Sequence, residues 1–403
     1  MSFQQGLSGL NAASKSLDVI GNNVANANTV GFKQSRAEFA DVYANALNGS
    51  GSGSAGIGVK VADIQRQFTQ GNITNTENPL DIAINGNGFF RLSNSGAITY
   101  SRNGQFQLDK SGYIVTSSGE RLTGYVADSN GALQTGALTD IQINSADLAP
   151  KASTKVNDVF NLDSRSAVIT ATFNANDPTT YTQVVPISIY DTQGNPHTLQ
   201  SYLTKTAANT WTVRTTIDGG TTPIQTSNLT FDTNGLLTGT TTQTVNLTTA
   251  NSTVSAAQSI TIDFATSTQF GSDYSLNSQV QDGYASGRLS SFSTAADGTI
   301  IGRYTNGQAK ALAQVVLAKF ANPNGLSALG NNQFAETADA GVPVIGKAGT
   351  GGLGVMQSSA TEDSNVDLTA ELVNMITAQR YYQANAQTIK TQDQVLQTLV
   401  NLR

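Results

Sequence analysis

The two ends of the chain carry apolar residues at a sevenfold spacing, and the long middle does not. Towards the N-terminus the spaced residues are Phe3, Leu7, Leu10, Leu17 and Val24. Towards the C-terminus they are Leu368, Leu372, Met375, Tyr382, Ile389, Leu396 and Val400. This spacing is typical of a coiled-coil seam, so it predicts helices over about 2–24 and 364–403. A narrow apolar stripe needs a partner, and the opposite end and a second copy of the chain are both candidates.

Between the ends, short alternating runs are separated by turn dipeptides such as Asn85-Gly86 and Asn306-Gly307. That rhythm predicts β-hairpins. Residues 148–283 are richer in Thr and contain the clearest hairpin, which joins 184–190 to 197–203. After residue 284 the pattern resembles 71–147 again. We therefore interpret 148–283 as an insertion into a discontinuous domain.

The predicted fold class is α+β and mostly β, with paired N- and C-terminal coiled-coil helices, a discontinuous β-domain and a second, inserted β-domain. The predicted boundaries are 1–28 and 364–403 for the terminal coiled-coil core, 29–70 and 355–363 for a connecting segment, 71–147 and 284–354 for the inner β-domain, and 148–283 for the outer one.

The connecting segment contains two further patterns. Phe39, Tyr43 and Leu47 are spaced by four, which predicts a short helix over 36–47. Residues 48–58 are rich in Gly and Ser, which predicts a flexible linker. Residues 51–56 match the dinucleotide-binding string, but that string binds nucleotides only between a strand and a helix N-terminus. Here the predicted order is reversed, so we expect no nucleotide site.

The C-terminal helix has its own start signal. Ser364 is a candidate N-cap, and Asp367 stands three residues later, where it could complete a capping box.

Composition argues against catalysis and nucleic-acid binding. Of the 403 residues only 12% are charged, against roughly 25% in an average soluble protein, and the net charge is -6. A phosphate-binding surface needs clustered Lys and Arg. The chain has no Cys and one His, His197, for which we expect a structural role. The acidic residues are scattered without metal-loop spacing, so we predict no enzyme activity, no metal and no cofactor.

The N-terminal residues lack a basic region and a continuous apolar core, which a Sec signal peptide requires. The sequence also lacks an apolar run long enough to span a bilayer. We expect no membrane partner. From these residues alone, a cytosolic protein and one exported without a signal peptide are both open.

Four runs resemble one family. Residues 22–33 (Asn-Asn-Val-Ala-Asn-Ala-Asn-Thr-Val-Gly-Phe-Lys) resemble the N-terminal signature of bacterial flagellar rod and hook proteins. Residues 364–368 (Ser-Asn-Val-Asp-Leu) and 387–394 (Gln-Thr-Ile-Lys-Thr-Gln-Asp-Gln) resemble their C-terminal signature, and 79–90 resemble their first outer β-domain. Within this family the chain is most similar to hook subunits, because shorter rod proteins lack an insertion such as 148–283.

The resemblance implies a homopolymer outside the cell, exported by the flagellar type III apparatus rather than by Sec. The polymer would be a curved hollow tube that serves as a universal joint and transmits motor torque to the filament. The stripe residues named above would form its assembly interface. Expected neighbours are the distal rod protein, the hook cap protein, the hook-length ruler and the hook-filament junction protein. Phe39 and Tyr43 resemble an element that such proteins present to the export gate.

Two alternatives remain at this point. One is a distal-rod-like axial protein, which would form straight, stiff polymers. The other belongs to a different class, a secreted β-rich adhesin or glycan-binding protein, which would have no use for matched terminal helices.

Overall fold

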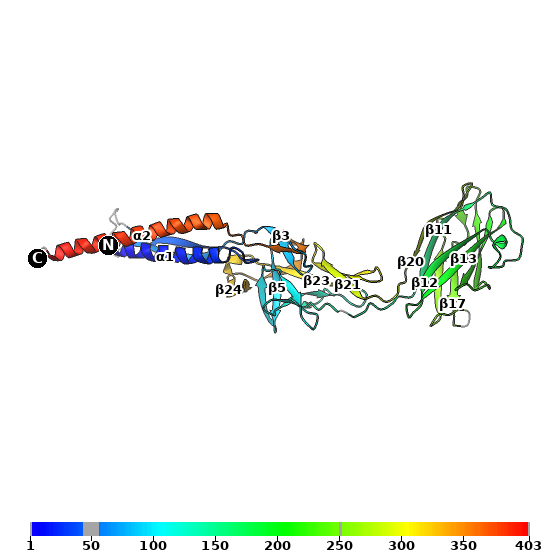
Figure 1. Cartoon of the computed structure of the whole chain (residues 1–403), viewed down its shortest axis with the longest axis horizontal. Coiled ribbons are helices and arrows are strands. Elements are labelled where there is room, and N and C mark those ends of the chain that lie inside the picture. Colours follow the sequence, from blue (N-terminus) through cyan, green and yellow to red (C-terminus); the bar gives the residue numbers. More distant parts are fainter. Residues whose placement is uncertain (1, 43–55, 145, 250–251, 402–403) are drawn as a thin grey trace. The chain divides into compact units, whose positions relative to one another are not determined.

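The computed structural model describes residues 2–42, 56–144, 146–249 and 252–401. These residues divide into two compact units. Unit 1 comprises Met1–Asn144, Ser291–Gly302 and Ala309–Arg403, and unit 2 comprises Ser145–Ser290 and Arg303–Gln308. Unit 1 holds both terminal helices and a β-region built from both halves of the chain (Figure 1). The predicted fold class is confirmed, whereas the finer domain boundaries stay a prediction.

Helix α1 (Ser2–Ala25) has the predicted extent, and helix α2 (Leu368–Asn401) begins later than predicted. Oδ1 of Asp367 accepts hydrogen bonds from the N–H groups of Thr369 (2.9 Å) and Ala370 (3.1 Å). The capping box starting at Ser364 is therefore wrong. An Asp carboxylate satisfies the free N–H groups of the first turn and suits the positive end of the helix dipole, so Asp367 is itself the cap.

The short helix predicted over 36–47 is also wrong for the residues described. Strand β1 (Ser35–Val42) pairs antiparallel with β2 (Gly58–Arg66), for example Ala37 with Ile64. A spacing of four residues fits one face of a strand as well as one face of a helix, because four is a multiple of two. The linker predicted over 48–58 lies mainly outside the described residues, as does all but the last residue of the dinucleotide-binding string at 51–56.

The β-region of unit 1 joins strands from before and after unit 2. In its main sheet, the apolar strand β23 (Ala309–Lys319) pairs with both β5 (Phe89–Asn94) and β9 (Arg121–Val126). The other strands of this sheet are β6 (Ala97–Ser101), β7 (Phe106–Leu108), β8 (Ile114–Thr116), β10 (Thr139–Asp140), β21 (Leu289–Thr294), β22 (Thr299–Tyr304), β24 (Ser327–Gly330), β25 (Gln333–Ala335) and β26 (Val344–Lys347).

Two smaller ladders repeat this joining of the halves. Strand β3 (Ile73–Asn75) pairs with β28 (Ala360–Glu362), and β4 (Ile82–Asn85) pairs with β27 (Val355–Ser358). These pairings bring the segment that follows β2 next to the segment that leads into α2.

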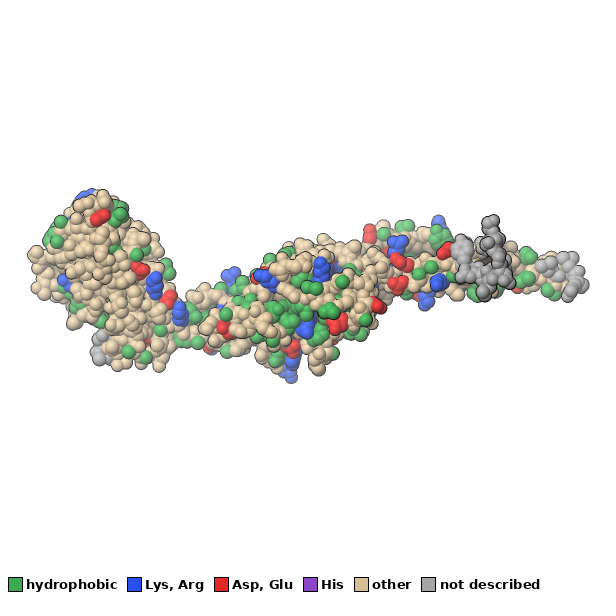
Figure 2. Space-filling view, turned by 180° about the vertical axis from the view of Figure 1, so that it is seen from behind, with side chains coloured by type: hydrophobic (Ala, Val, Ile, Leu, Met, Phe, Trp, Pro, Cys, Tyr) green, Lys and Arg blue, Asp and Glu red, His purple; other side chains and the backbone are tan. Residues whose placement is uncertain are grey.

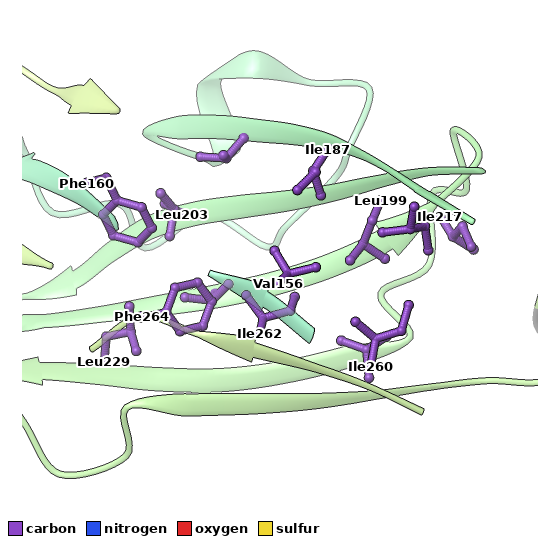
Figure 3. Packing of buried hydrophobic residues seen from close by; sticks show 14 of the residues in the cluster. Val156, Phe160, Ile187, Leu199, Leu203, Ile217, Leu229, Ile260, Ile262 and Phe264 are labelled. Carbon is purple, nitrogen blue, oxygen red and sulfur yellow. The ribbon is translucent and has the colours of Figure 1, made fainter. Parts of the chain in front are cut away.

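Unit 2 consists of two five-stranded sheets whose buried side chains form one core (Figure 3). The hairpin predicted over 184–203 is confirmed, since β12 (Gln183–Tyr190) pairs antiparallel with β13 (Pro196–Ala207). The first sheet adds β14 (Thr210–Ile217), β15 (Gln225–Phe231) and β16 (Leu237–Thr238). The second contains β11 (Lys155–Asp163), β17 (Thr242–Leu247), β18 (Gln258–Asp263), β19 (Thr268–Phe270) and β20 (Ser275–Gln281).

Candidate assembly interface

Helices α1 and α2 lie side by side and antiparallel (Figure 1). Gly6 packs against Ile389, and Gly9 packs against Asn385 one turn earlier in α2. A Cβ atom at Gly9 would lie 2.7 Å from Oδ1 of Asn385, and one at Gly6 would lie 3.1 Å from Cγ1 of Ile389. The two backbones approach this closely only because neither position carries a side chain.

The seam between the helices uses a stripe of mostly small α1 residues. In α1 the buried positions Gly6, Ala13 and Ile20 are spaced by seven. In α2 the buried residues Glu371 and Ala378 are again seven apart, and Glu371 accepts a hydrogen bond from Asn23 of α1 (3.4 Å). The predicted stripe residues of α1, such as Leu10 and Leu17, are only half-buried and lie beside this seam, whereas Ile20 lies in it. The sequence analysis named Ile389 of this seam, but it missed Gly6, Gly9 and Ala13 because they are small.

The structure places the predicted interface residues at two levels of burial. The exposed residues are Phe3, Leu7, Leu368, Leu372, Tyr382, Leu396 and Val400. The half-buried residues are Leu10, Leu17, Val24, Met375 and Ile389. Of the two predicted export-gate residues, Phe39 is exposed on β1, and Tyr43 lies outside the described residues.

Asparagines from the two signature runs tie α1 and the segment before α2 to the ends of the β1–β2 hairpin. Asn23 exchanges two hydrogen bonds with the backbone of Ser35, at 2.8 and 2.9 Å. Asn365 accepts a hydrogen bond from the N–H group of Gln34 (2.8 Å) and donates to the carbonyl of Gln67 (2.8 Å). The side-chain amide supplies a donor and an acceptor at once, which neither Asp nor Leu can do.

A buried cluster of charges lies at the same junction. Nζ of Lys33 donates to Oε1 of Glu362 (2.6 Å) and to the carbonyl of Thr69 (2.7 Å). Nε of Arg102 lies 3.4 Å from Oε2 of the same carboxylate. The side chains of Lys33 and Glu362 are fully buried. The Glu362 carboxylate in β28 thus connects that strand to the turn after α1 and to the main sheet.

Burial lowers the pKa of Lys33, against the opposing attraction of Glu362. Burial likewise lowers the pKa of Arg102, again against the attraction of Glu362. The cluster was not predicted, because Lys33 and Glu362 are 329 positions apart in the chain. Gly31, just before it, has a φ of 71° and packs against the backbone of Asn103, so a larger residue would push these segments apart.

His197 lies in unit 2. Its Nδ1 atom is 2.8 Å from Oδ2 of Asp218, and its Nε2 atom is 3.6 Å from Oδ2 of Asp191. Burial tends to raise the pKa of Asp218, but hydrogen bonds from Thr253 and His197 outweigh it and keep that pKa below its ordinary value. The ring therefore links a hairpin turn to neighbouring loops.

Four flagellar family models match consecutive parts of the chain. They are the flagella basal body rod protein model (residues 3–33), the flagellar hook protein FlgE/F/G D1 domain (83–158), the flagellar basal body protein FlaE D2 domain (161–284) and the flagellar basal body rod FlgEFG protein C-terminal model (357–402).

Full-length relatives agree with these models. The flagellar hook protein FlgE of Salmonella typhimurium is 45% identical over 100% of both chains, and that of Escherichia coli is 43% identical over the same share. The chain belongs to the flagellar hook protein FlgE family. A solved structure, Helicobacter pylori flagellar hook protein FlgE2, has the same fold, with a TM-score of 0.55 at 17% identity over 72% of this chain and 100% of that one.

Membership makes the chain an exported structural subunit of the flagellar hook, in a family that assembles into axial structures. On the face drawn in Figure 2, charged side chains are few and scattered, and most of the surface is neither charged nor hydrophobic. Within the described residues, no helix combines the length and apolarity needed to cross a membrane.

Proposed function

We propose that copies of this hook subunit polymerise through the helix pair into a curved hollow tube, which transmits motor torque as a flexible universal joint. One observation carries the proposal. The α1–α2 seam is already filled within the chain, yet large apolar side chains stay exposed on both helices, including Phe3 (46%) and Leu372 (44%). Burying such a side chain is worth roughly 1.5–3 kcal/mol, and a neighbouring copy supplies the cover.

The resemblance to hook subunits extends the proposal to partners. The subunit would be exported by the flagellar type III apparatus without a Sec signal peptide. In the extracellular hook it would meet the distal rod protein at one end and the hook-filament junction protein at the other. The hook cap protein and the hook-length ruler would act during growth.

The test compares two charged substitutions on α2. Leu372→Asp puts a carboxylate on the exposed apolar face, whereas Thr377→Asp puts one on an exposed polar position nearby. We expect Leu372→Asp to abolish tubes in negative-stain images and the control to keep them, with unchanged circular dichroism in both. Normal tubes from Leu372→Asp would contradict the proposed interface. Straight tubes from the unaltered protein would favour a distal-rod role instead.

We further propose that Phe39, with Tyr43, is recognised by the export gate. Phe39 is 43% exposed on β1, and Ile64 on β2 of the same hairpin is 47% exposed. Phe39→Ala should lower the amount of secreted protein, and the matched control Ile64→Ala should not. Equal secretion of both variants would contradict this role.

A further inference from the structure

Helix α2 is longer than the helix it packs against. Since Gly6 meets Ile389 and the helices run antiparallel, the first residues of α1 end opposite about residue 393 of α2. Helix α2 continues to Asn401. Its last two turns therefore have no α1 residue opposite them. Leu396 stands seven residues after Ile389, so it continues the seam spacing beyond the end of α1.

The overhang and the start of α1 lie at the same end of the helix pair, and the exposed apolar side chains of both are together named the far patch. Its members are Phe3 (46% exposed), Leu7 (45%), Val395 (48%), Leu396 (50%) and Val400 (72%). A second exposed surface, the near patch, lies at the opposite end of α2. Its members are Leu368 (47%), Leu372 (44%), Val373 (59%) and Ile376 (52%). The other exposed residues within the near patch, Thr369, Ala370 and Asn374, are uncharged.

We propose that the far patch of one copy packs on the near patch of the next copy. The proposal rests on the polymerisation proposed above and names the surfaces that meet. The two patches cannot meet within one chain, because Leu372 and Leu396 are 24 residues apart on one helix, or about 36 Å.

The geometry also selects the kind of contact. Far-to-near packing is heterologous, so each added copy leaves one free patch of each kind and growth continues without closing. Near-to-near packing would be isologous and would end at a dimer. A second copy is thus the occupant that extends the seam already formed between α1 and α2.

The absence of cysteine makes the contact testable by cross-linking. Leu372→Cys and Leu396→Cys proteins of different tag length are mixed, assembled, treated with a short bis-maleimide and separated under denaturing conditions. We expect a mixed dimer from the mixture, no dimer from either protein alone, and a ladder from the double variant. Tyr381→Cys with Leu396→Cys is the matched control, since Tyr381 is 64% exposed but outside both patches, and should give no dimer.

Each other outcome has a definite meaning. Tubes without a mixed dimer would overturn the near–far contact and leave the proposed polymer intact. Dimers from one variant alone would show isologous packing and would also overturn the near–far contact. Absence of tubes from the unaltered protein would instead contradict the proposed function. Should a cysteine at 372 or 396 impair assembly, Ile376→Cys with Val395→Cys gives the same readout from the same two patches.

Discussion

At the scale of single residues, stability depends on a few buried charges in a chain that has few charges. The Glu362 carboxylate has cationic partners in Lys33 and Arg102. Asp158 in β11 is the opposite case: it is 1% exposed, and neither carboxylate oxygen has a hydrogen-bond partner in the described chain. A paired charge and an unpaired one should respond differently to substitution.

Asp158 should make unit 2 less stable as the pH rises. Burial raises the pKa of Asp158 to about 6. A carboxyl group whose folded pKa exceeds its unfolded value contributes stability at low pH, and this is lost as the pH rises through the folded pKa. We expect a loss on the order of 2–3 kcal/mol between pH 4 and 8. Thermal unfolding followed by the fluorescence of Trp211, buried in the same core, measures it.

Asp158→Asn should remove most of this dependence and raise the melting temperature at pH 8. Asp163→Asn on the same strand is the control, because hydrogen bonds from Arg165 keep the pKa of Asp163 below its ordinary value. An Asp158→Asn protein that melts lower than the parent at pH 8 would contradict the interpretation.

Lys33→Met should destabilise unit 1 strongly. It leaves Glu362 buried with one cation fewer, and breaking a buried pair costs about 3–5 kcal/mol. Lys15→Met removes the exposed pair with Asp18, whose side chains are 60% and 63% exposed, and should change stability by less than about 1 kcal/mol. Denaturant unfolding of both variants gives the comparison. Equal losses of stability in the two variants would show that the buried cluster of Lys33, Arg102 and Glu362 does not stabilise unit 1.

At the scale of elements, the close approach of the helix pair depends on the absence of side chains at Gly6 and Gly9. Gly9→Leu should separate α1 from α2, because a Cβ there already meets Asn385. Gly21→Ala should stabilise α1 by about 0.5–1 kcal/mol, since nothing lies within 4 Å of the added atom. Helix content by circular dichroism should therefore fall in the first variant and hold or rise in the second. The reverse order would refute this packing.

At the scale of the whole molecule, the two segments that lead into and out of unit 2 are held together by isolated β-bridges. Leu148 pairs with Gly287, and Lys151 pairs with Tyr284. Replacing residues 152–283 by a short Gly/Ser linker should leave unit 1 folded and able to polymerise, because the ends to be joined already meet. We expect straighter tubes and poorer swimming in a hook-deficient strain, since the predicted outer domain would supply weak polar contacts that exchange partners during bending.

Electron microscopy and a swimming assay decide this prediction. Loss of all polymer would show that unit 2 belongs to the assembling core. Unchanged curvature would show that it takes no part in the joint.

The sequence by itself determined the terminal helices, the β-rich middle and the family. These follow from local patterns: sevenfold apolar spacing at the ends, turn dipeptides that punctuate alternating runs, and signature runs such as 22–33. Each pattern is complete within a few dozen residues, so no knowledge of distant contacts is needed to recognise it.

The tertiary structure decided which face of each helix is the seam, that 35–42 forms a strand, and where the buried charges meet. Apolar patterns give weight to large side chains, but close helix packing selected Gly6, Gly9 and Ala13. A spacing of four fits both a helix and a strand, and pairing with β2 decided for the strand. The Lys33–Glu362 pair joins opposite ends of the chain. Such contacts depend on how the backbone returns to itself, which local spacing does not encode.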